Sequence, residues 1–112
     1  MQRLLALSAL LALAAPVAPR AEGFITGSQL MQACTARSLD SDRLCTGFIA
    51  GAADQVSANP ALKGELCPLP VGVSLKDVKA TVVKYGQEHA DKVRQPGVLL
   101  LNEAVRERYP CK

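Results

Sequence analysis

The chain has 112 residues, a formal net charge of +3, no tryptophan and four aromatic residues. Basic and acidic residues are interspersed along it, and no basic patch of the kind that binds nucleic acid is present. A chain of this length forms one small domain, whose core must be built mainly from aliphatic side chains.

The first 21 residues have the pattern of a secretory signal peptide. Arg3 supplies a positive charge, and a run of twelve residues at 4–15 follows it, apolar except for Ser8 and ended by Pro16. This run is too short to cross a bilayer, for which about twenty residues are needed. Cleavage after Ala21 would leave a mature domain of residues 22–112 with a net charge of about +1, because Arg3 and Arg20 would be lost. We therefore expect a periplasmic protein without a membrane span in its mature form.

Two consecutive helices are predicted in the first half of the mature domain. The spacing of apolar residues predicts the first over residues 28–38, with Ser28 as its N-cap. The sequence LDSD at residues 39–42 predicts a turn, and its serine and aspartates are good caps for a second helix over residues 42–57. A short turn between two helices indicates a helical hairpin.

The predicted second helix has an apolar face and two glycines. The apolar residues that recur at helical spacing are Leu44, Cys45, Phe48, Ile49, Ala52, Ala53 and Val56. Gly47 and Gly51 form a GxxxG pattern within the same helix. Each glycine costs about 1 kcal/mol of helix propensity, so we expect a neighbouring helix to approach closely over both.

Residues 58–73 are predicted to form an irregular connection, because prolines occur near both of its ends. A loop of this length is long for a small domain, and long loops are often functional. The other explanation is that Cys67 fixes a connection that merely has to cross the molecule. The sequence leaves both explanations open.

Two further helices are predicted in the C-terminal half. Ser74 and Asp77 form an S-x-x-D capping signature at the start of the first, and its apolar stripe ends at His89. No sequence signal supplies a catalytic partner for His89, so we expect this histidine to cap or pack the helix. The last helix is expected from about Pro96 to about Tyr109. No segment has the alternating pattern of a half-buried strand, and the predicted fold class is all-α, a compact four-helix domain.

All four cysteines, Cys34, Cys45, Cys67 and Cys111, lie in the predicted mature domain. An even number of cysteines in a small exported domain is typical of disulfides. The nearest two are eleven residues apart, which is too far for the paired ligands of a structural zinc site.

Four cysteines allow three pairings, and the sequence does not decide among them with certainty. We favour Cys34–Cys45, between consecutive helices, and Cys67–Cys111, between the loop and the C-terminus, and we expect no metal or cofactor.

Five segments occur in an order that is similar to a known family. They are Cys34, CTGFIAGAAD at 45–54, CPLPVGVSLKDV at 67–78, VVKYGQEH at 82–89 and RYPC at 108–111. Together they resemble the Rap/Tai family of immunity proteins of type VI secretion over roughly residues 28–111. Gly86 and Ala90 depart from it, since the family usually has a bulky apolar residue and a proline there. The resemblance implies a periplasmic, all-helical, disulfide-bonded and often dimeric domain that blocks peptidoglycan-cleaving amidase effectors.

These features predict a binding protein rather than an enzyme. By the resemblance, its partner is an amidase effector whose active site it occludes, and because the family is often dimeric, both a monomer and a homodimer stay open. The candidate contact surfaces are the loop of residues 58–73 and the turn of residues 90–95, because loops on a rigid scaffold commonly carry binding. The partner-binding residues predicted in the loop are Leu62, Lys63, Gly64 and Glu65. The alternatives are a periplasmic stress-related chaperone, a helical scaffold with no toxin partner, and an enzyme.

Overall fold

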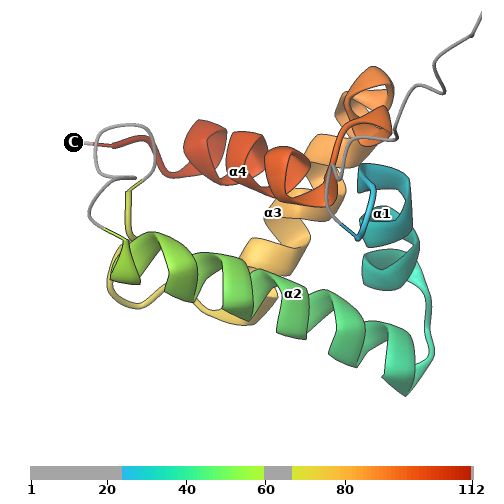
Figure 1. The fold of residues 1–112 in the computed structure, drawn as a ribbon, viewed down its shortest axis with the longest axis horizontal. Helices are drawn as coiled ribbons and strands as arrows, with labels where there is room; N and C mark the ends of the chain where they lie inside the picture. The colour runs from blue at the N-terminus through green and yellow to red at the C-terminus, as the bar shows by residue number, and fades with distance from the viewer. Residues whose placement is uncertain (1–23, 60–66, 112) are drawn as a thin grey trace, which may run out of the picture.

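The computed structural model describes residues 24–59 and 67–111 (Figure 1). These residues form four α-helices and one 3-10 helix, with no strand among them. The elements are α1 (Gly27–Thr35), α2 (Leu39–Ala58), α3 (Leu75–Glu88), η2 (Ala90–Arg94) and α4 (Gly97–Arg108). The predicted all-α fold class is confirmed. The predicted signal peptide lies outside the described residues.

Helix α1 begins one residue before the predicted N-cap. Thr26 is the N-cap, and its hydroxyl accepts the N–H of Gln29 at 3.2 Å. The Gln29 side chain accepts the N–H of Thr26 in return, which completes a capping box. Ser28 lies in the first turn instead, so its prediction as the N-cap is wrong.

Helix α2 includes the segment that was predicted as a turn. Its N-cap is Ser38, whose hydroxyl accepts the N–H of Ser41 at 3.2 Å. Asp40 and Asp42 lie in the first turn, where negative charge is favourable beside the positive end of the helix dipole. The prediction of a turn at residues 39–42 is therefore wrong, because the capping residues of LDSD lie just inside the helix.

The helices surround a core of small and aliphatic side chains. Figure 1 shows α2 and α4 on opposite sides of the molecule, α3 crossing behind them and α1 at one end. The buried hydrophobic residues are Leu30, Ala33, Cys34, Cys45, Ile49, Val78, Val82, Leu100, Leu101 and Ala104. Leu44, predicted on the buried face of α2, is 51% exposed. The core thus uses one narrow edge of α2 around Cys45 and Ile49.

The GxxxG pattern does not mark a contact between helices. Gly47 and Gly51 are exposed, and a Cβ built at either would meet no described atom within 4 Å beyond its chain neighbours and the backbone of α2 itself. Close approach occurs instead at Gly86 of α3, which is buried beneath Met31 of α1. A Cβ at Gly86 would overlap the methionine side chain. The expectation for the GxxxG pair is wrong, and a glycine outside that pattern permits the contact between α1 and α3.

Helices α1 and α4 begin side by side and share backbone hydrogen bonds. Gly27, the first residue of α1, donates its N–H to the carbonyl of Gln95 at 2.8 Å. Gly97, the first residue of α4, donates its N–H to the carbonyl of Ile25, also at 2.8 Å. The first N–H groups of a helix lack acceptors within the helix, so this exchange satisfies both. It also fixes the chain just before α4 against the start of α1.

Helix α3 begins as predicted. The Ser74 hydroxyl accepts the N–H of Asp77 at 3.1 Å, and the Asp77 carboxylate accepts the N–H of Ser74 at 3.0 Å. This reciprocal pair confirms the capping signature read from the sequence. Val78 and Val82 carry the buried side of the helix, which ends at Glu88.

Both favoured disulfides are present, Cys34–Cys45 and Cys67–Cys111. The first joins α1 to α2 inside the core, and the second joins the chain that follows α2 to the chain that follows α4. Their sequence separations are 11 and 44 residues. Together they connect the N-terminal helical pair and fasten the C-terminus to the middle of the chain.

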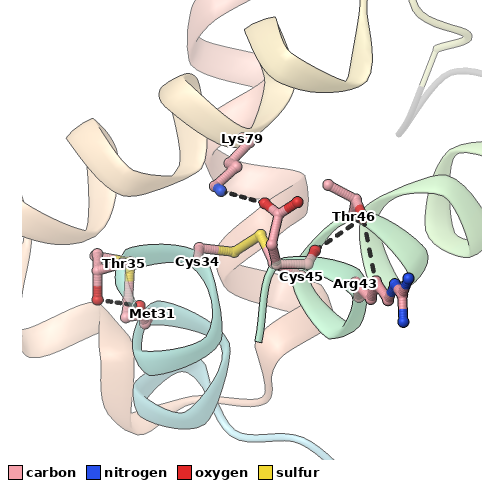
Figure 2. Close-up of a disulfide and its surroundings, with 8 residues drawn as sticks. Met31, Cys34, Thr35, Arg43, Cys45, Thr46 and Lys79 are labelled. Carbon is pink, nitrogen blue, oxygen red and sulfur yellow. Dashed lines mark hydrogen bonds and ion pairs between the residues drawn. A yellow bond between two sulfur atoms is a disulfide. The ribbon is translucent and has the colours of Figure 1, made fainter. Parts of the chain in front are cut away.

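An ion pair lies beside the buried disulfide. Figure 2 shows Lys79 of α3 reaching towards α2, where its ammonium group donates to the carboxylate of Asp42. The same turn of α2 is tightened by Thr46, whose hydroxyl donates to the Asp42 carbonyl at 2.8 Å. The disulfide and the ion pair thus connect α2 to two different helices at nearly the same point.

Candidate functional site

The structure describes one of the two predicted contact surfaces in full. Leu62, Lys63, Gly64 and Glu65, predicted to bind a partner, lie outside the described residues, and their role stays a prediction. The turn predicted at residues 90–95 is the short 3-10 helix η2 followed by Gln95. Asp91 and Arg94 are exposed on it, and Lys92 is half-buried.

The turn is held against the start of α1. The Gln95 carbonyl accepts the N–H of Gly27, and the Val93 carbonyl accepts the hydroxyl of Ser28 at 3.3 Å. The backbones approach so closely that a Cβ at Gly27 would lie 2.6 Å from the Val93 carbonyl oxygen. Gly27 is therefore required by the position of η2. Sequence reasoning missed this residue, because its neighbour Val93 is far away in the chain.

A second attachment runs through Glu103 of α4. Its Oε2 atom accepts hydrogen bonds from the Gln95 amide at 2.9 Å and from the Tyr85 hydroxyl at 3.2 Å. Burial raises the pKa of Tyr85, and the hydrogen bond to Glu103 and the charge of that carboxylate raise it further. Glu103 thus connects α3, the end of η2 and α4. No motif in the sequence marks this residue.

His89 lies between the end of α3 and the start of η2. It is the C-cap of that helix, and its Nδ1 atom lies 2.9 Å from the Tyr85 carbonyl oxygen. A carbonyl oxygen only accepts hydrogen bonds, so Nδ1 is the protonated nitrogen in this arrangement. The His89 and Tyr85 rings are stacked with centroids 4.0 Å apart. The predicted capping or packing role of His89 is confirmed.

Exposed apolar side chains follow the turn directly. Val98 and Leu99, in the first turn of α4, are 41% and 46% exposed. We define the η2 surface as Asp91, Lys92, Arg94, Val98 and Leu99. Protein interfaces commonly combine apolar groups at their centre with charged and polar groups at their rim. The η2 surface has this composition on a backbone that is fixed from α1, α3 and α4.

Two hollows beside α4 suit a ligand less well. A cavity between α2 and α4 has a volume of about 40 Å³, far below the roughly 300–1,000 Å³ of small-molecule sites. A groove of about 290 Å³ between α3 and α4 is open and carries charges of both signs. Within residues 24–59 and 67–111, no group of three or more His, Cys, Asp or Glu side chains is placed to hold a metal ion.

Comparison with known proteins identifies the family. The family model described as Rap1a immunity proteins matches residues 26–111. This chain belongs to the Rap1a immunity protein family. The match begins at the N-cap of α1, ends at Cys111, and includes both disulfides and the whole η2 surface. Searches of curated proteins and of solved structures found no match.

Membership in the Rap1a family implies an immunity function, in which the protein binds a toxin effector. The family and the two disulfides together indicate an exported protein, because disulfides persist in oxidising compartments. None of the helices in the described part of the chain has the length and hydropathy needed to cross a membrane.

Proposed function

We propose that this Rap1a protein is a periplasmic immunity protein of type VI secretion that binds a peptidoglycan-cleaving amidase effector and occludes its active site. The observation that carries the proposal is the family match over residues 26–111, which spans the complete disulfide-bonded helical domain. The motifs shared with the Rap/Tai family supply the amidase as the effector class. Signal-peptide cleavage after Ala21 would deliver the domain to the compartment where peptidoglycan is attacked.

The η2 surface is the part of the described chain that we propose enters or covers the amidase cleft. A surface that is already ordered loses little conformational entropy on binding, which favours affinity. The attachments of Gln95 to Gly27 and to Glu103 provide that order. Exposed Asp91 and Arg94 can pair with charges on the effector, and Val98 and Leu99 can be buried against it.

The inhibition follows from geometry and needs no chemical step by the immunity protein. A bound domain that covers the amidase nucleophile prevents the peptide stem of peptidoglycan from reaching it. The effector remains chemically intact and recovers its activity when the complex dissociates. Inhibition should therefore be stoichiometric and reversible.

The proposal is tested by searching the neighbouring genes for an amidase effector and assaying that enzyme with the immunity protein. We expect the purified mature domain to inhibit peptidoglycan cleavage by its cognate amidase at a one-to-one ratio of binding sites. Arg94→Glu should weaken inhibition at least tenfold, because it reverses a charge on the η2 surface. Arg43→Glu is the matched control, since it makes the same charge change on the exposed side of α2. Equal effects of the two variants would show that the η2 surface is not the contact.

The loop of residues 58–73 is tested separately. Replacing residues 62–65 by Gly and Ser changes the segment of Leu62, Lys63, Gly64 and Glu65 and removes the side chains of Leu62, Lys63 and Glu65 as predicted partner contacts. If these residues bind the effector, inhibition should fall while the circular dichroism spectrum of the helices is retained. Unchanged inhibition by the folded variant would remove the loop from the proposed interface.

A homodimer belongs to the same proposal, by the resemblance to the Rap/Tai family. Sedimentation velocity over a range of protein concentrations measures it directly. A single species with the mass of one chain at all concentrations would contradict it.

The chaperone alternative has its own test. If the protein prevents a model protein from aggregating at pH 2 to 3 and does not inhibit an amidase, the chaperone alternative is favoured.

A further inference from the structure

The two disulfides differ in their access to solvent. Cys34 and Cys45 are 4% and 0% exposed within the hydrophobic core. Cys111 is exposed at the end of the described chain, and Cys67 is half-buried. A disulfide is reduced when a thiolate attacks one of its sulfur atoms, so access determines which bridge reacts first. The same reductant therefore finds one accessible disulfide and one that the core protects.

The accessible disulfide borders the cavity between α2 and α4. The lining of this cavity includes Ile49 of α2 together with Cys67, Leu69, Tyr109 and Cys111. Figure 1 shows the C-terminus near the end of α2, on the side of the molecule away from α1. The Cys67–Cys111 bond thus joins the two non-helical segments at one end of an apolar hollow. Without that bond, Leu69 and Tyr109 would be held over the hollow by non-covalent contacts alone.

We propose that the Cys67–Cys111 disulfide is a reversible redox strap that a dithiol oxidoreductase reduces selectively in the folded protein. A thiolate of the dithiol attacks Sγ of Cys111, forms a mixed disulfide and releases Cys67 as a thiolate. The second thiol of the donor then loses its proton to water and attacks the donor's first sulfur atom in the mixed disulfide, which releases Cys111 as a thiolate. Two electrons pass to the protein, the dithiol becomes a disulfide, and the two released thiolates take protons from water.

The rest of the fold is expected to survive this reduction. The core cluster includes Leu30, Ile49, Val82 and Leu101, which come from four different helices, and Leu30 and Val82 do not line the cavity beside the strap. The buried Cys34–Cys45 bond continues to join α1 and α2. Reduction should therefore free the segments around Cys67 and Cys111 and open the apolar cavity, while the helices remain packed.

Selective alkylation tests the proposal. The oxidised mature protein is incubated at neutral pH with a thioredoxin-type dithiol protein, quenched at intervals with iodoacetamide and mapped by peptide mass spectrometry. Cys67 and Cys111 should be modified at least tenfold faster than Cys34 and Cys45. Simultaneous modification of all four cysteines, or earlier modification of Cys34 and Cys45, would overturn the proposal.

A paired variant tests whether the helices remain packed without the strap. Cys67→Ser/Cys111→Ser mimics the reduced state and should retain the helical circular dichroism signal and the buried Cys34–Cys45 bond. Amide hydrogen exchange should rise at the non-proline residues of 67–73 and 109–111 and stay unchanged at Leu30 and Val82, which do not line the cavity. Global unfolding of this variant, or exchange identical to that of the oxidised protein, would each contradict the redox strap.

Discussion

At the scale of single residues, two glycines that look alike in the sequence have opposite surroundings. Gly27 is buried at the start of α1, against the backbone of Val93. Gly47 is exposed in the middle of α2, and no described atom beyond its chain neighbours and the backbone of α2 itself lies within 4 Å of a Cβ built there. The first glycine is required by a close backbone contact. The second only lowers helix propensity in the isolated domain.

We predict that Gly47→Ala and Gly27→Ala change stability in opposite directions. Gly47→Ala should raise the free energy of unfolding by about 0.5–1 kcal/mol, through the higher helix propensity of alanine. Gly27→Ala should lower it by about 1–3 kcal/mol, because the new methyl group meets a backbone that cannot move cheaply. Urea denaturation followed by circular dichroism measures both. A stabilised Gly27→Ala variant would contradict the described contact between α1 and η2.

The capping box of α3 predicts a dependence of stability on pH. Hydrogen bonds from the backbone and side chain of Ser74 hold the pKa of Asp77 below its ordinary value of 3.8. The ionised carboxylate therefore stabilises the folded state above that ordinary value, and the contribution is lost as the pH falls through the lower pKa of the folded state. Asp77→Asn keeps the shape of the side chain but removes the charge.

We expect the stability difference between the wild type and Asp77→Asn to be largest above about pH 5, where the carboxylate is ionised even in the unfolded chain. It should shrink as the pH is lowered towards 2. Urea denaturation of both proteins across this range measures the difference. A difference that does not depend on pH would show that the charge of Asp77 has no part in the cap.

At the scale of elements, η2 is a turn whose position depends on its neighbours. Its own five residues contain no buried side chain. It is positioned by backbone contacts with α1, by the capping of α3 at His89, and by the bond between Gln95 and Glu103. A short 3-10 helix has little intrinsic stability, so these attachments determine whether the turn presents one fixed surface.

We predict that Glu103→Ala loosens η2 without unfolding the domain. The change removes the shared acceptor of Tyr85 and Gln95 and should cost about 1–2 kcal/mol, because both donors lie partly out of water. Hydrogen exchange should accelerate at the amides of Lys92 and Gln95. Glu107→Ala, on the exposed side of α4, is the control. Equal acceleration in the two variants would remove Glu103 from its role as the attachment point.

At the scale of the whole molecule, a small aliphatic core is supplemented by covalent links. Loop-closure entropy assigns roughly 3 kcal/mol to the Cys34–Cys45 disulfide and roughly 4 kcal/mol to Cys67–Cys111. The total stability of a small domain is commonly about 5–15 kcal/mol, so these contributions are large by comparison. The fold is therefore suited to an oxidising compartment.

We predict that the protein recovered from the periplasm of an expressing bacterium is processed and fully oxidised. Its intact mass should correspond to a chain that begins at Glu22 and contains no free thiol. Alkylation before and after reduction, followed by mass spectrometry, counts the thiols. A retained leader, or four free thiols, would contradict both the export and the disulfide requirement.

The sequence by itself determined the features that depend on neighbouring residues or on covalent chemistry. The Ser74–Asp77 cap, the helix that ends beside His89 and the all-α class follow from local patterns. The exported context favoured disulfides. The position of the η2 turn was predicted in the same way. Local rules also fit more than one residue: Ser28, the predicted N-cap of α1, and Thr26, the observed one, are both residue types that cap helices.

Only the tertiary structure decided which positions are close to each other in space. Gly27 meets Val93, Gly86 meets Met31, and Glu103 joins Tyr85 to Gln95 across segments distant in the chain. Helical periodicity shows that a helix has an apolar side, but not which of its glycines a neighbouring helix will cover. That choice depends on how the helices pack together, and no pattern within a single helix records it.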